Sequence, residues 1–176
     1  MSISRQTLTI VIVTFKSEKV IDNCIKSISD QIKIIIVDNS NDQNLKDSLE
    51  KKYKNVECIL SSSNLGMGSG NNLGLNNVKT DYALILNPDV ILQENTISEI
   101  INESKKIESF AVLAPLSEDQ KNPNYKIIQN DKKNINNLNP FKVKSVDGFA
   151  MLLNLKEINQ IDDFRNKKYL DENFFM

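Results

Sequence analysis

The chain has 176 residues and contains no histidine. A Ser-His-Asp triad, a Cys-His pair, an HExxH zinc site and an imidazole general base are therefore all excluded. Its two cysteines, Cys24 and Cys58, are too few for a disulfide framework and lack the CxxC spacing of a zinc site. We expect both to be small core residues in a reducing compartment. Any chemistry must rest on carboxylates, amides, hydroxyls, lysines or a bound metal.

A charge excess of either sign is also lacking, because 22 basic residues balance 23 acidic ones, and only Arg5 and Arg165 are arginines. A nucleic-acid-binding protein would normally present a basic face with arginine forks, so we expect no nucleic-acid partner. No apolar run approaches the roughly 18 residues that cross a bilayer, and we recognise no signal peptide. We expect a cytoplasmic protein, with peripheral contact at the inner face of a membrane left open.

What the sequence does contain is an alternation of strand-like and helix-like segments. Short β-branched apolar runs predict buried strands, and apolar residues at helical spacing predict the helices between them. The strands are expected at Leu8–Phe15, Ile32–Val37, Val56–Leu60 and Tyr82–Leu86. The helices are expected at Ser17–Ser29 (with Ser17 as N-cap), Leu45–Lys54 and Thr96–Ile107. This order predicts a single α/β domain over residues 1–176, with a mostly parallel, Rossmann-like sheet flanked by helices.

The pattern weakens after Phe110, where only short strand-like runs remain. They lie at Phe110–Ala114, Tyr125–Gln129, Val143–Val146 and Phe149–Leu153. The segment Asn130–Asn139 is so rich in asparagine and lysine that we expect a loop there. No internal repeat or linker divides the chain.

Three of the expected strands end in polar residues. These are Thr14, the run Asp38-Asn39-Ser40, and the run Asn87-Pro88-Asp89. Ligands of open parallel sheets bind outside the carboxyl ends of the strands, so the three clusters together predict a cleft. Asp, Asn and Pro also simply terminate strands, which leaves a purely structural role open for any one cluster.

Four of the five glycines lie within one short segment, at positions Gly66, Gly68, Gly70 and Gly74. Such a segment lets backbone N–H groups approach a phosphate, and we expect a helix turn to follow it near Leu75. A flexible loop is the alternative. The spacing fits neither the P-loop nor the dinucleotide-binding fingerprint.

Six segments carry a further signal in their order along the chain. They are VIVTFK at 11–16, IIIVDNSNDQ at 34–43, NLGMGSGNNLGL at 64–75, YALILNPDVIL at 82–92, VDGFAMLL at 146–153 and YLDENFFM at 169–176. Together they resemble the motifs of family 2 glycosyltransferases with the GT-A fold, and NPD is similar to the variant common among bacterial rhamnosyltransferase-like enzymes. The resemblance implies a UDP- or dTDP-sugar donor, Mg²⁺ or Mn²⁺, and inverting transfer to a glycan or lipid-linked acceptor in polysaccharide biosynthesis.

The resemblance assigns the nucleotide base to the first two strand ends. Thr14 and Phe15 match positions that line the base pocket. Asp38 matches the carboxylate that accepts a hydrogen bond from the pyrimidine N3–H, and a carboxylate is well suited to read such a donor.

It assigns the ribose, phosphates and metal to the later motifs. Asn64, Gly66 and Asn71 match the loop near the ribose and donor phosphates. Asn87 and Asp89 occupy the two ends of the family's DXD motif, with Asn87 among the donor-binding residues and Asp89 as the metal ligand.

The resemblance also bears on the catalytic base, since an inverting transfer needs a carboxylate that takes the acceptor proton. The family carries it on an acidic motif that would follow Met176, so we expect a C-terminally truncated, donor-binding portion of a longer transferase, with Asp171 as the candidate inside the chain. Two alternatives stay open: a donor-binding fragment without turnover, and a GT-A-like nucleotidyltransferase. The latter carries a glycine-rich basic loop after the first strand, where this chain has TFKSEK.

Overall fold

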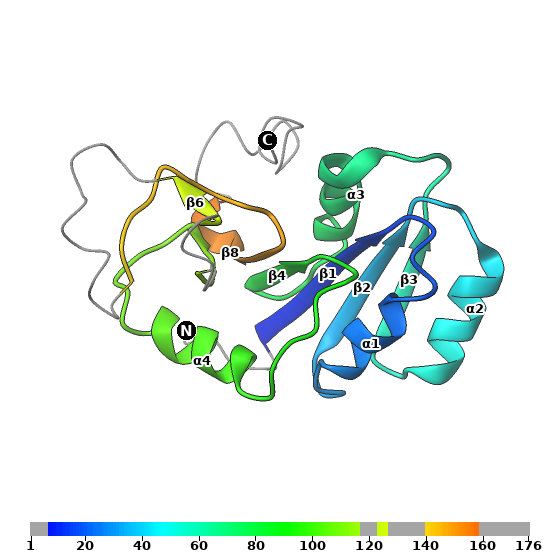
Figure 1. The fold of residues 1–176 in the computed structure, drawn as a ribbon, viewed down its shortest axis with the longest axis horizontal. Helices are drawn as coiled ribbons and strands as arrows, with labels where there is room; N and C mark the ends of the chain where they lie inside the picture. The colour runs from blue at the N-terminus through cyan, green and yellow to red at the C-terminus, as the bar shows by residue number, and fades with distance from the viewer. Residues whose placement is uncertain (1–6, 117–122, 127–139, 159–176) are drawn as a thin grey trace.

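A six-stranded sheet organises the protein in a computed structural model, which describes residues 7–116, 123–126 and 140–158 (Figure 1). From one edge to the other the strands are β3 (Val56–Leu60), β2 (Lys33–Asp38), β1 (Leu8–Thr14), β4 (Tyr82–Leu86), β8 (Ala150–Asn154) and β5 (Val112–Leu113). The first four are mutually parallel, whereas β8 runs antiparallel to both of its neighbours. A separate antiparallel pair joins β6 (Tyr125–Lys126) to β7 (Ser145–Val146).

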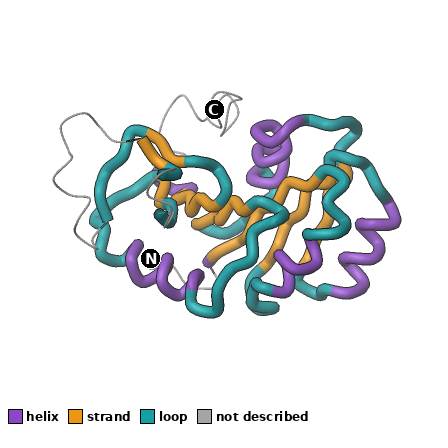
Figure 2. Tube along the Cα trace, in the orientation of Figure 1, coloured by secondary structure: helices purple, strands orange, loops and turns teal. Residues whose placement is uncertain are grey.

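Helices cover both faces of the sheet (Figures 1 and 2). On one face lie α1 (Ile21–Lys26), α2 (Gln43–Lys52) and α4 (Thr96–Ser104), and on the other lie α3 (Gly66–Leu75) and α5 (Leu155–Ile158). Successive strand residues point to opposite faces, so Ile10 and Ile12 join the first core cluster and Val11 joins the second. The predicted α/β sheet flanked by helices is confirmed.

The central strands are buried along their whole length, which explains why they are apolar on both faces. Every residue of β1 and of β4 is buried. Strands β3 and β4 have the predicted bounds, β1 ends one residue earlier than predicted, and β2 is shifted by one residue at both ends. Both cysteines are buried and free, as predicted. Among the described residues, no helix combines the length and apolarity needed to cross a membrane.

Two helices begin at residues other than those predicted, because of local hydrogen bonds. The helix expected from Ser17 begins only at Ile21, because a turn precedes it in which the Ser17 carbonyl accepts bonds from Val20 N and Ile21 N at 3.0 Å each. Helix α2 begins earlier than expected, since Asp42 Oδ1 caps it by accepting from Asn44 N at 2.8 Å and Leu45 N at 3.2 Å.

The prediction for the glycine segment was wrong in one respect, because most of it is helix α3 itself rather than a loop before a helix turn. A Cβ on Gly70 would lie 2.8 Å from Val13 Cγ1, and one on Gly74 would overlap Val11 Cγ1. These two glycines therefore let the helix backbone lie directly on β1. Close packing against the sheet outweighs the low helix propensity of glycine.

After α4 the sheet is completed by short pieces. The predicted strand Phe110–Ala114 is reduced to β5, and α4 ends at Ser104, before the predicted Ile107. The strand predicted from Phe149 is β8, shifted by one residue. The predicted loop Asn130–Asn139 and the end of the predicted strand Tyr125–Gln129 lie outside the described residues.

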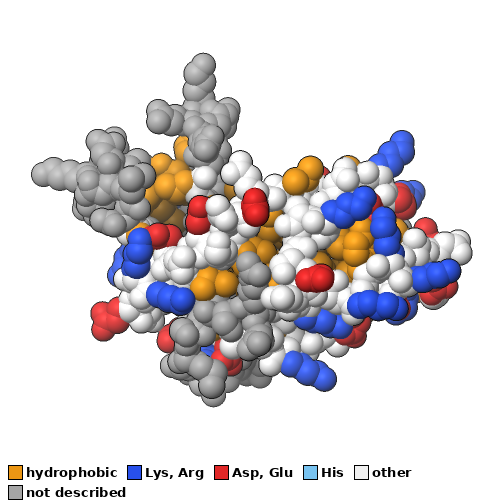
Figure 3. Space-filling model, turned by 90° about the horizontal axis from the view of Figure 1, so that it is seen from below, with side chains coloured by type: hydrophobic (Ala, Val, Ile, Leu, Met, Phe, Trp, Pro, Cys, Tyr) orange, Lys and Arg blue, Asp and Glu red, His pale blue; other side chains and the backbone are white. Residues whose placement is uncertain are grey.

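Figure 3 views the face that α1, α2 and α4 cover. Blue lysine side chains and red carboxylates intermingle there, with apolar side chains between them. This mixture agrees with the balanced charge of the sequence.

Candidate functional site

The ends of β1, β2 and β4 meet at one edge of the sheet, as predicted. Thr14 pairs with Asp38 across β1 and β2, and Asn39 N donates to the Thr14 carbonyl at 2.8 Å. Ile12 pairs with Leu86, so Asn87 follows on the other side of β1. The three polar clusters therefore border one edge, where ligands of parallel sheets bind.

Asp38 organises the loop that follows β2. Its side chain is fully buried; Oδ1 accepts from Ser40 N at 3.1 Å and Ser40 Oγ at 2.6 Å, while Oδ2 accepts from Asp42 N at 2.7 Å. Asp42 in turn caps α2. Sequence reasoning gave Asp38 a ligand-binding role only, and the structure adds a structural one.

The loops after β1 and β2 both contain a non-glycine residue in the left-handed region. They are Lys16, with φ of 53°, and Asn41, with φ of 58°. Asparagine adopts this conformation readily, but lysine does so rarely. Beside Lys16, the ring of Phe15 is 46% exposed, and the lysine Nζ lies 5.4 Å from its centroid. An aromatic face is thus presented directly after β1.

Several buried polar atoms near this edge have no hydrogen-bond partner among the described residues. They are Thr14 Oγ1, Asn39 Oδ1 and both amide atoms of Asn71, whose side chain is fully buried. Buried polar groups in proteins almost always have a partner, so these atoms indicate a bound molecule or ordered water. Asn39 was not among the predicted site residues, although its place in the strand-end cluster was a usable signal.

The start of α3 lies against the same edge. Asn39 Nδ2 donates to the Gly66 carbonyl at 3.1 Å, and Asn64 Oδ1 accepts from Gly66 N at 3.0 Å. Gly66 has φ of +74°, which a side chain rarely allows, and both Gly66 and Asn64 are exposed. Of the predicted phosphate-loop residues, Asn64 and Gly66 are on the surface, whereas Asn71 is buried behind them.

The turn after β4 carries the remaining predicted residues. Asn87 N donates to the Phe149 carbonyl at 2.9 Å, and its own carbonyl accepts from Val90 N at 3.2 Å. Asp89 is exposed and forms neither an ion pair nor a hydrogen bond with another described residue. Burial, and to a smaller extent the charge of Asp89, raises the pKa of the nearby Cys24 thiol to about 12.

The expected divalent metal fits this arrangement through a single protein carboxylate. The described residues include no cluster of three or more acidic or cysteine side chains able to enclose an ion. Mg²⁺ and Mn²⁺ are commonly held by one or two carboxylates together with substrate phosphates and water. Asp89, exposed and without a partner among the described residues, suits that mode of binding. Asp171 lies outside the described residues.

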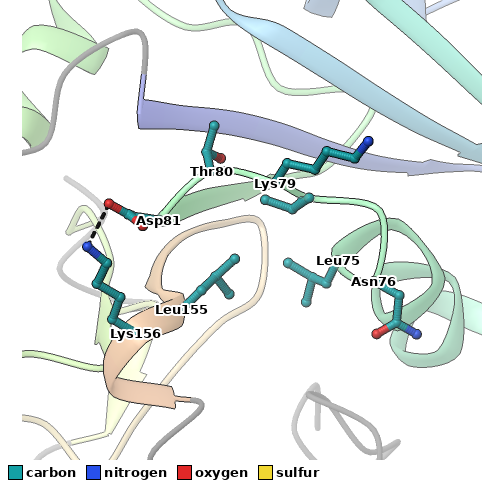
Figure 4. A pocket seen from close by; sticks show the side chains of 8 residues that line it. Leu75, Asn76, Lys79, Thr80, Asp81, Leu155 and Lys156 are labelled. Carbon is teal, nitrogen blue, oxygen red and sulfur yellow. Dashed lines mark ion pairs between the residues drawn. The ribbon is translucent and has the colours of Figure 1, made fainter.

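A hollow of about 230 Å³ lies elsewhere (Figure 4). It is lined by residues from the end of α3, the loop between α3 and β4, and the start of α5, including Lys79, Leu155 and the ion pair between Asp81 and Lys156 at 2.8 Å. Because β4 begins there, this hollow is at the opposite edge of the parallel strands from the candidate cleft. Its position does not match a strand-end ligand site.

Comparison with known proteins gives these observations a context. The family described as "Glycosyl transferase family 2" matches residues 9–161. The low-salt glycan biosynthesis hexosyltransferase Agl10 of Haloferax volcanii is 30% identical over 112 residues, which cover 61% of this chain and 36% of that protein. The chain thus spans about a third of the length of this relative.

Solved structures share the fold. Staphylococcus aureus TarS 1–349 has a TM-score of 0.61 at 16% identity, with 89% of this chain and 49% of that chain covered, and it is also known with UDP and with UDP-GlcNAc. The mannosyltransferase PcManGT from Pyrobaculum calidifontis, in complex with GDP-Man and Mn²⁺, has a TM-score of 0.64 at 10% identity, with 89% and 46% covered. The chain therefore spans about half of each of these proteins.

Proposed function

Because this chain belongs to glycosyl transferase family 2, we propose that its strand-end cleft binds the nucleotide-sugar donor of a glycosyl transfer reaction. The observation that carries the proposal is the set of buried polar atoms without partners on Thr14, Asn39 and Asn71. Such atoms are costly unless a ligand or water completes their hydrogen bonds, and a nucleoside diphosphate offers both donors and acceptors. The complexes of TarS with UDP-GlcNAc and of PcManGT with GDP-Man support this donor class.

The base we propose is a pyrimidine, so that the donor is a UDP- or dTDP-sugar. The exposed ring of Phe15 offers a stacking face beside Thr14. An ionised carboxylate has about four acceptor sites. Donors of the loop occupy two acceptor sites on Asp38 Oδ1 and one on Oδ2. One acceptor site is left for the N3–H group of the base. Because Asp38 is fully buried, the base reaches it only when the loop shifts on binding.

The donor phosphates would lie between the start of α3 and the turn after β4. Asn64 and Gly66 lie at that helix start, Asn71 lies buried in the middle of the helix, and Asn87 lies in the turn. Asp89 would hold Mg²⁺ or Mn²⁺ against the diphosphate. Mn²⁺ is the metal in the PcManGT complex. When bound, the metal neutralises charge on the departing nucleoside diphosphate.

Transfer with inversion to a glycan or lipid-linked acceptor completes the proposal. A glycan acceptor is supported by Agl10, whose name describes a hexosyltransferase of glycan biosynthesis. Three further points stay predictions: the rhamnosyl-type donor, the role in polysaccharide biosynthesis and contact with a membrane surface. The catalytic base also stays a prediction, with Asp171 as the candidate within the chain.

Calorimetry with UDP, dTDP and GDP, with and without Mn²⁺, tests donor binding. We expect the two pyrimidine nucleotides to bind more tightly than GDP in the presence of Mn²⁺. A charge-assisted hydrogen bond is worth roughly 1.5 to 3 kcal/mol, so Asp38→Ala should weaken UDP binding about tenfold or more. Equal affinity for GDP and UDP would contradict a pyrimidine pocket, and no nucleotide binding at all would overturn the proposal.

A matched variant separates base recognition from loop structure. Asp42→Ala removes the cap of α2 and disturbs the same loop, but it leaves the Asp38 carboxylate in place. We expect it to lower the free energy of unfolding by about 1 kcal/mol while weakening UDP binding much less than Asp38→Ala does. Equal weakening by the two variants would show that Asp38 acts only through the loop.

Turnover assays separate the two alternatives that the sequence left open. Sugar transfer to a supplied acceptor would exclude a binding fragment without turnover. Pyrophosphate exchange would instead indicate a nucleotidyltransferase.

A further inference from the structure

We propose that helix α1 positions Asp89 by clamping the turn after β4 at both of its ends, through Cys24 and Ser27. The inference rests on the proposed function, because it takes Asp89 to be the metal ligand. It concerns two residues that make no contribution of their own to the candidate cleft.

Two contacts define the clamp. On one side of Asp89, Cys24 Sγ donates to the Asn87 carbonyl at 3.7 Å. On the other side, Leu92 N donates to Ser27 Oγ at 3.0 Å. Cys24 lies within α1 and Ser27 is its C-cap, three residues later, so the two side chains bracket the turn that carries Asp89. The contacts join positions 63 and 65 residues apart in the chain.

The Ser27 hydroxyl is oriented for this role. Its Oγ donates to the Cys24 carbonyl at 2.7 Å, which points its lone pairs outward to accept from Leu92 N. The hydroxyl therefore donates its proton to the backbone of α1 and accepts a hydrogen bond from the turn after β4. The thiol of Cys24 carries the proton that it donates to the Asn87 carbonyl.

The helix itself is anchored on its other side. Asp22 Oδ1 accepts from Tyr53 Oη at 2.6 Å, its Oδ2 pairs with Lys26 at 2.6 Å, and Lys52 contacts the same carboxylate. The apolar side chains of Ile21 and Ile25 are buried against the sheet. Helix α1 is therefore a fixed support between α2 and the turn.

The clamp matters because nothing else in the described residues holds the Asp89 carboxylate. Its position depends on the backbone from Asn87 to Leu92, where Val90 N bonds back to the Asn87 carbonyl and Asn87 N bonds to Phe149. Val90 and Leu92 pack partly buried against the core, whereas Ile91 between them is 65% exposed. A loosely held turn would spread Asp89 over many positions, and ordering it on metal binding would reduce the apparent metal affinity.

The test compares Ser27→Ala with Ser104→Ala. In the control, Ser104 Oγ makes the same type of bond within α4, to the Ile101 carbonyl at 2.7 Å, and it bonds to no described residue of the turn. Losing one hydrogen bond of typical strength should raise the Mn²⁺ concentration that half-maximally enhances UDP binding about fivefold in Ser27→Ala. The affinity for UDP without metal should stay unchanged, and Ser27→Thr should restore the wild-type value.

A second readout needs neither metal nor nucleotide. Amide hydrogen exchange of Leu92, followed by NMR in the free chain, should be several-fold faster in Ser27→Ala and unchanged in Ser104→Ala. An unchanged exchange rate, or an Mn²⁺ dependence equal to that of the control, overturns the clamp.

Asp89→Asn distinguishes failure of the clamp from failure of the proposed metal site. We expect this variant to lose the Mn²⁺ enhancement altogether while keeping its fold. If Mn²⁺ enhances UDP binding equally in Asp89→Asn and the wild type, the metal role of Asp89 is overturned, and the purpose given to the clamp falls with it.

Discussion

Helices α1 and α3 begin at the same edge of the sheet but are held to it in opposite ways. Helix α3 lies on β1 because Gly70 and Gly74 have no side chains to separate the two backbones. Helix α1 is held by side chains, with Asp22 bonded toward α2 and Ser27 bonded toward the turn after β4. Close backbone contact places the start of α3 beside the strand ends. The bonds that hold α1 come from separate side chains, so each can be removed by a single substitution.

The largest effect is expected from a side chain added to α3. In Gly74→Ala the new Cβ would overlap Val11 Cγ1 and lie 3.3 Å from Val37 Cγ2, and both valines are buried. Overpacking costs about 1 to 3 kcal/mol, which exceeds the gain in helix propensity of up to about 1 kcal/mol. We expect a net loss of unfolding free energy in urea denaturation.

Two further variants show whether the overlap is the cause. Ser69→Ala, a small change in the same helix, should leave stability within about 0.5 kcal/mol of the wild type. Adding Val11→Ala to Gly74→Ala should cost less than the sum of the single changes, because the overlapping methyl groups are gone. A Gly74→Ala variant as stable as the wild type would show that α3 does not need close contact.

A smaller effect is expected on α1, from Asp22→Asn. Hydrogen bonds from Lys26, Lys52 and Tyr53 hold the pKa of Asp22 well below its ordinary value of 3.8. A lowered pKa in the folded state stabilises the protein above about pH 4, and this contribution disappears as the pH falls further through the folded-state pKa. Asp22→Asn should therefore lower stability at pH 7, by less than Gly74→Ala, because partly exposed pairs are weak.

Urea denaturation at several pH values measures this effect. The difference between wild type and Asp22→Asn should be constant from pH 5 to 7 and should shrink below about pH 4. Asp30→Asn, which removes the same charge from an exposed position, serves as the control. A difference that grows as the pH falls would contradict the sign of the pKa change.

The smallest expected effect is the rate at which iodoacetamide labels Cys24, which reports whether α1 separates from the sheet. Burial raises the pKa of both the Cys24 and Cys58 thiols to about 12, so very little thiolate is present at pH 8. Iodoacetamide should label neither thiol in the folded chain faster than unfolding allows, and should label both quickly in urea. Rapid labelling of Cys24 alone, followed by mass spectrometry, would show that α1 lifts from the sheet.

Local patterns in the sequence predicted much of this molecule. The runs Val56–Leu60 and Tyr82–Leu86 are strands with the predicted bounds. Tyr82–Leu86 is buried between helices on both faces, which requires a continuous apolar run. Strand-end residues such as Thr14 and Asp38 were correctly expected at one edge, since parallel neighbouring strands end together. The family resemblance and the fold it implied are also confirmed.

Other features were missed because contacts with distant segments produce them. The glycine run from Gly66 to Gly74 has poor helix propensity, and it forms a helix because its bare backbone packs on Val11 and Val13. Asn39 bonds to Gly66 across 27 residues, which no local pattern reveals. The contact of Ser27 with Leu92 was also missed, because the two residues are 65 positions apart and meet only in the folded protein.

The order of residues along the chain was thus sufficient for the central strands, the sheet type and the edge at which the polar strand ends gather. These follow from side-chain alternation and from the composition of short segments, which are local properties. The helical state of the glycine segment, the bonds of Asp38 to its own loop and the contacts of α1 with the turn after β4 required the folded sheet. They depend on which strands become neighbours, and in the order β3-β2-β1-β4 the fourth strand along the chain lies against the first.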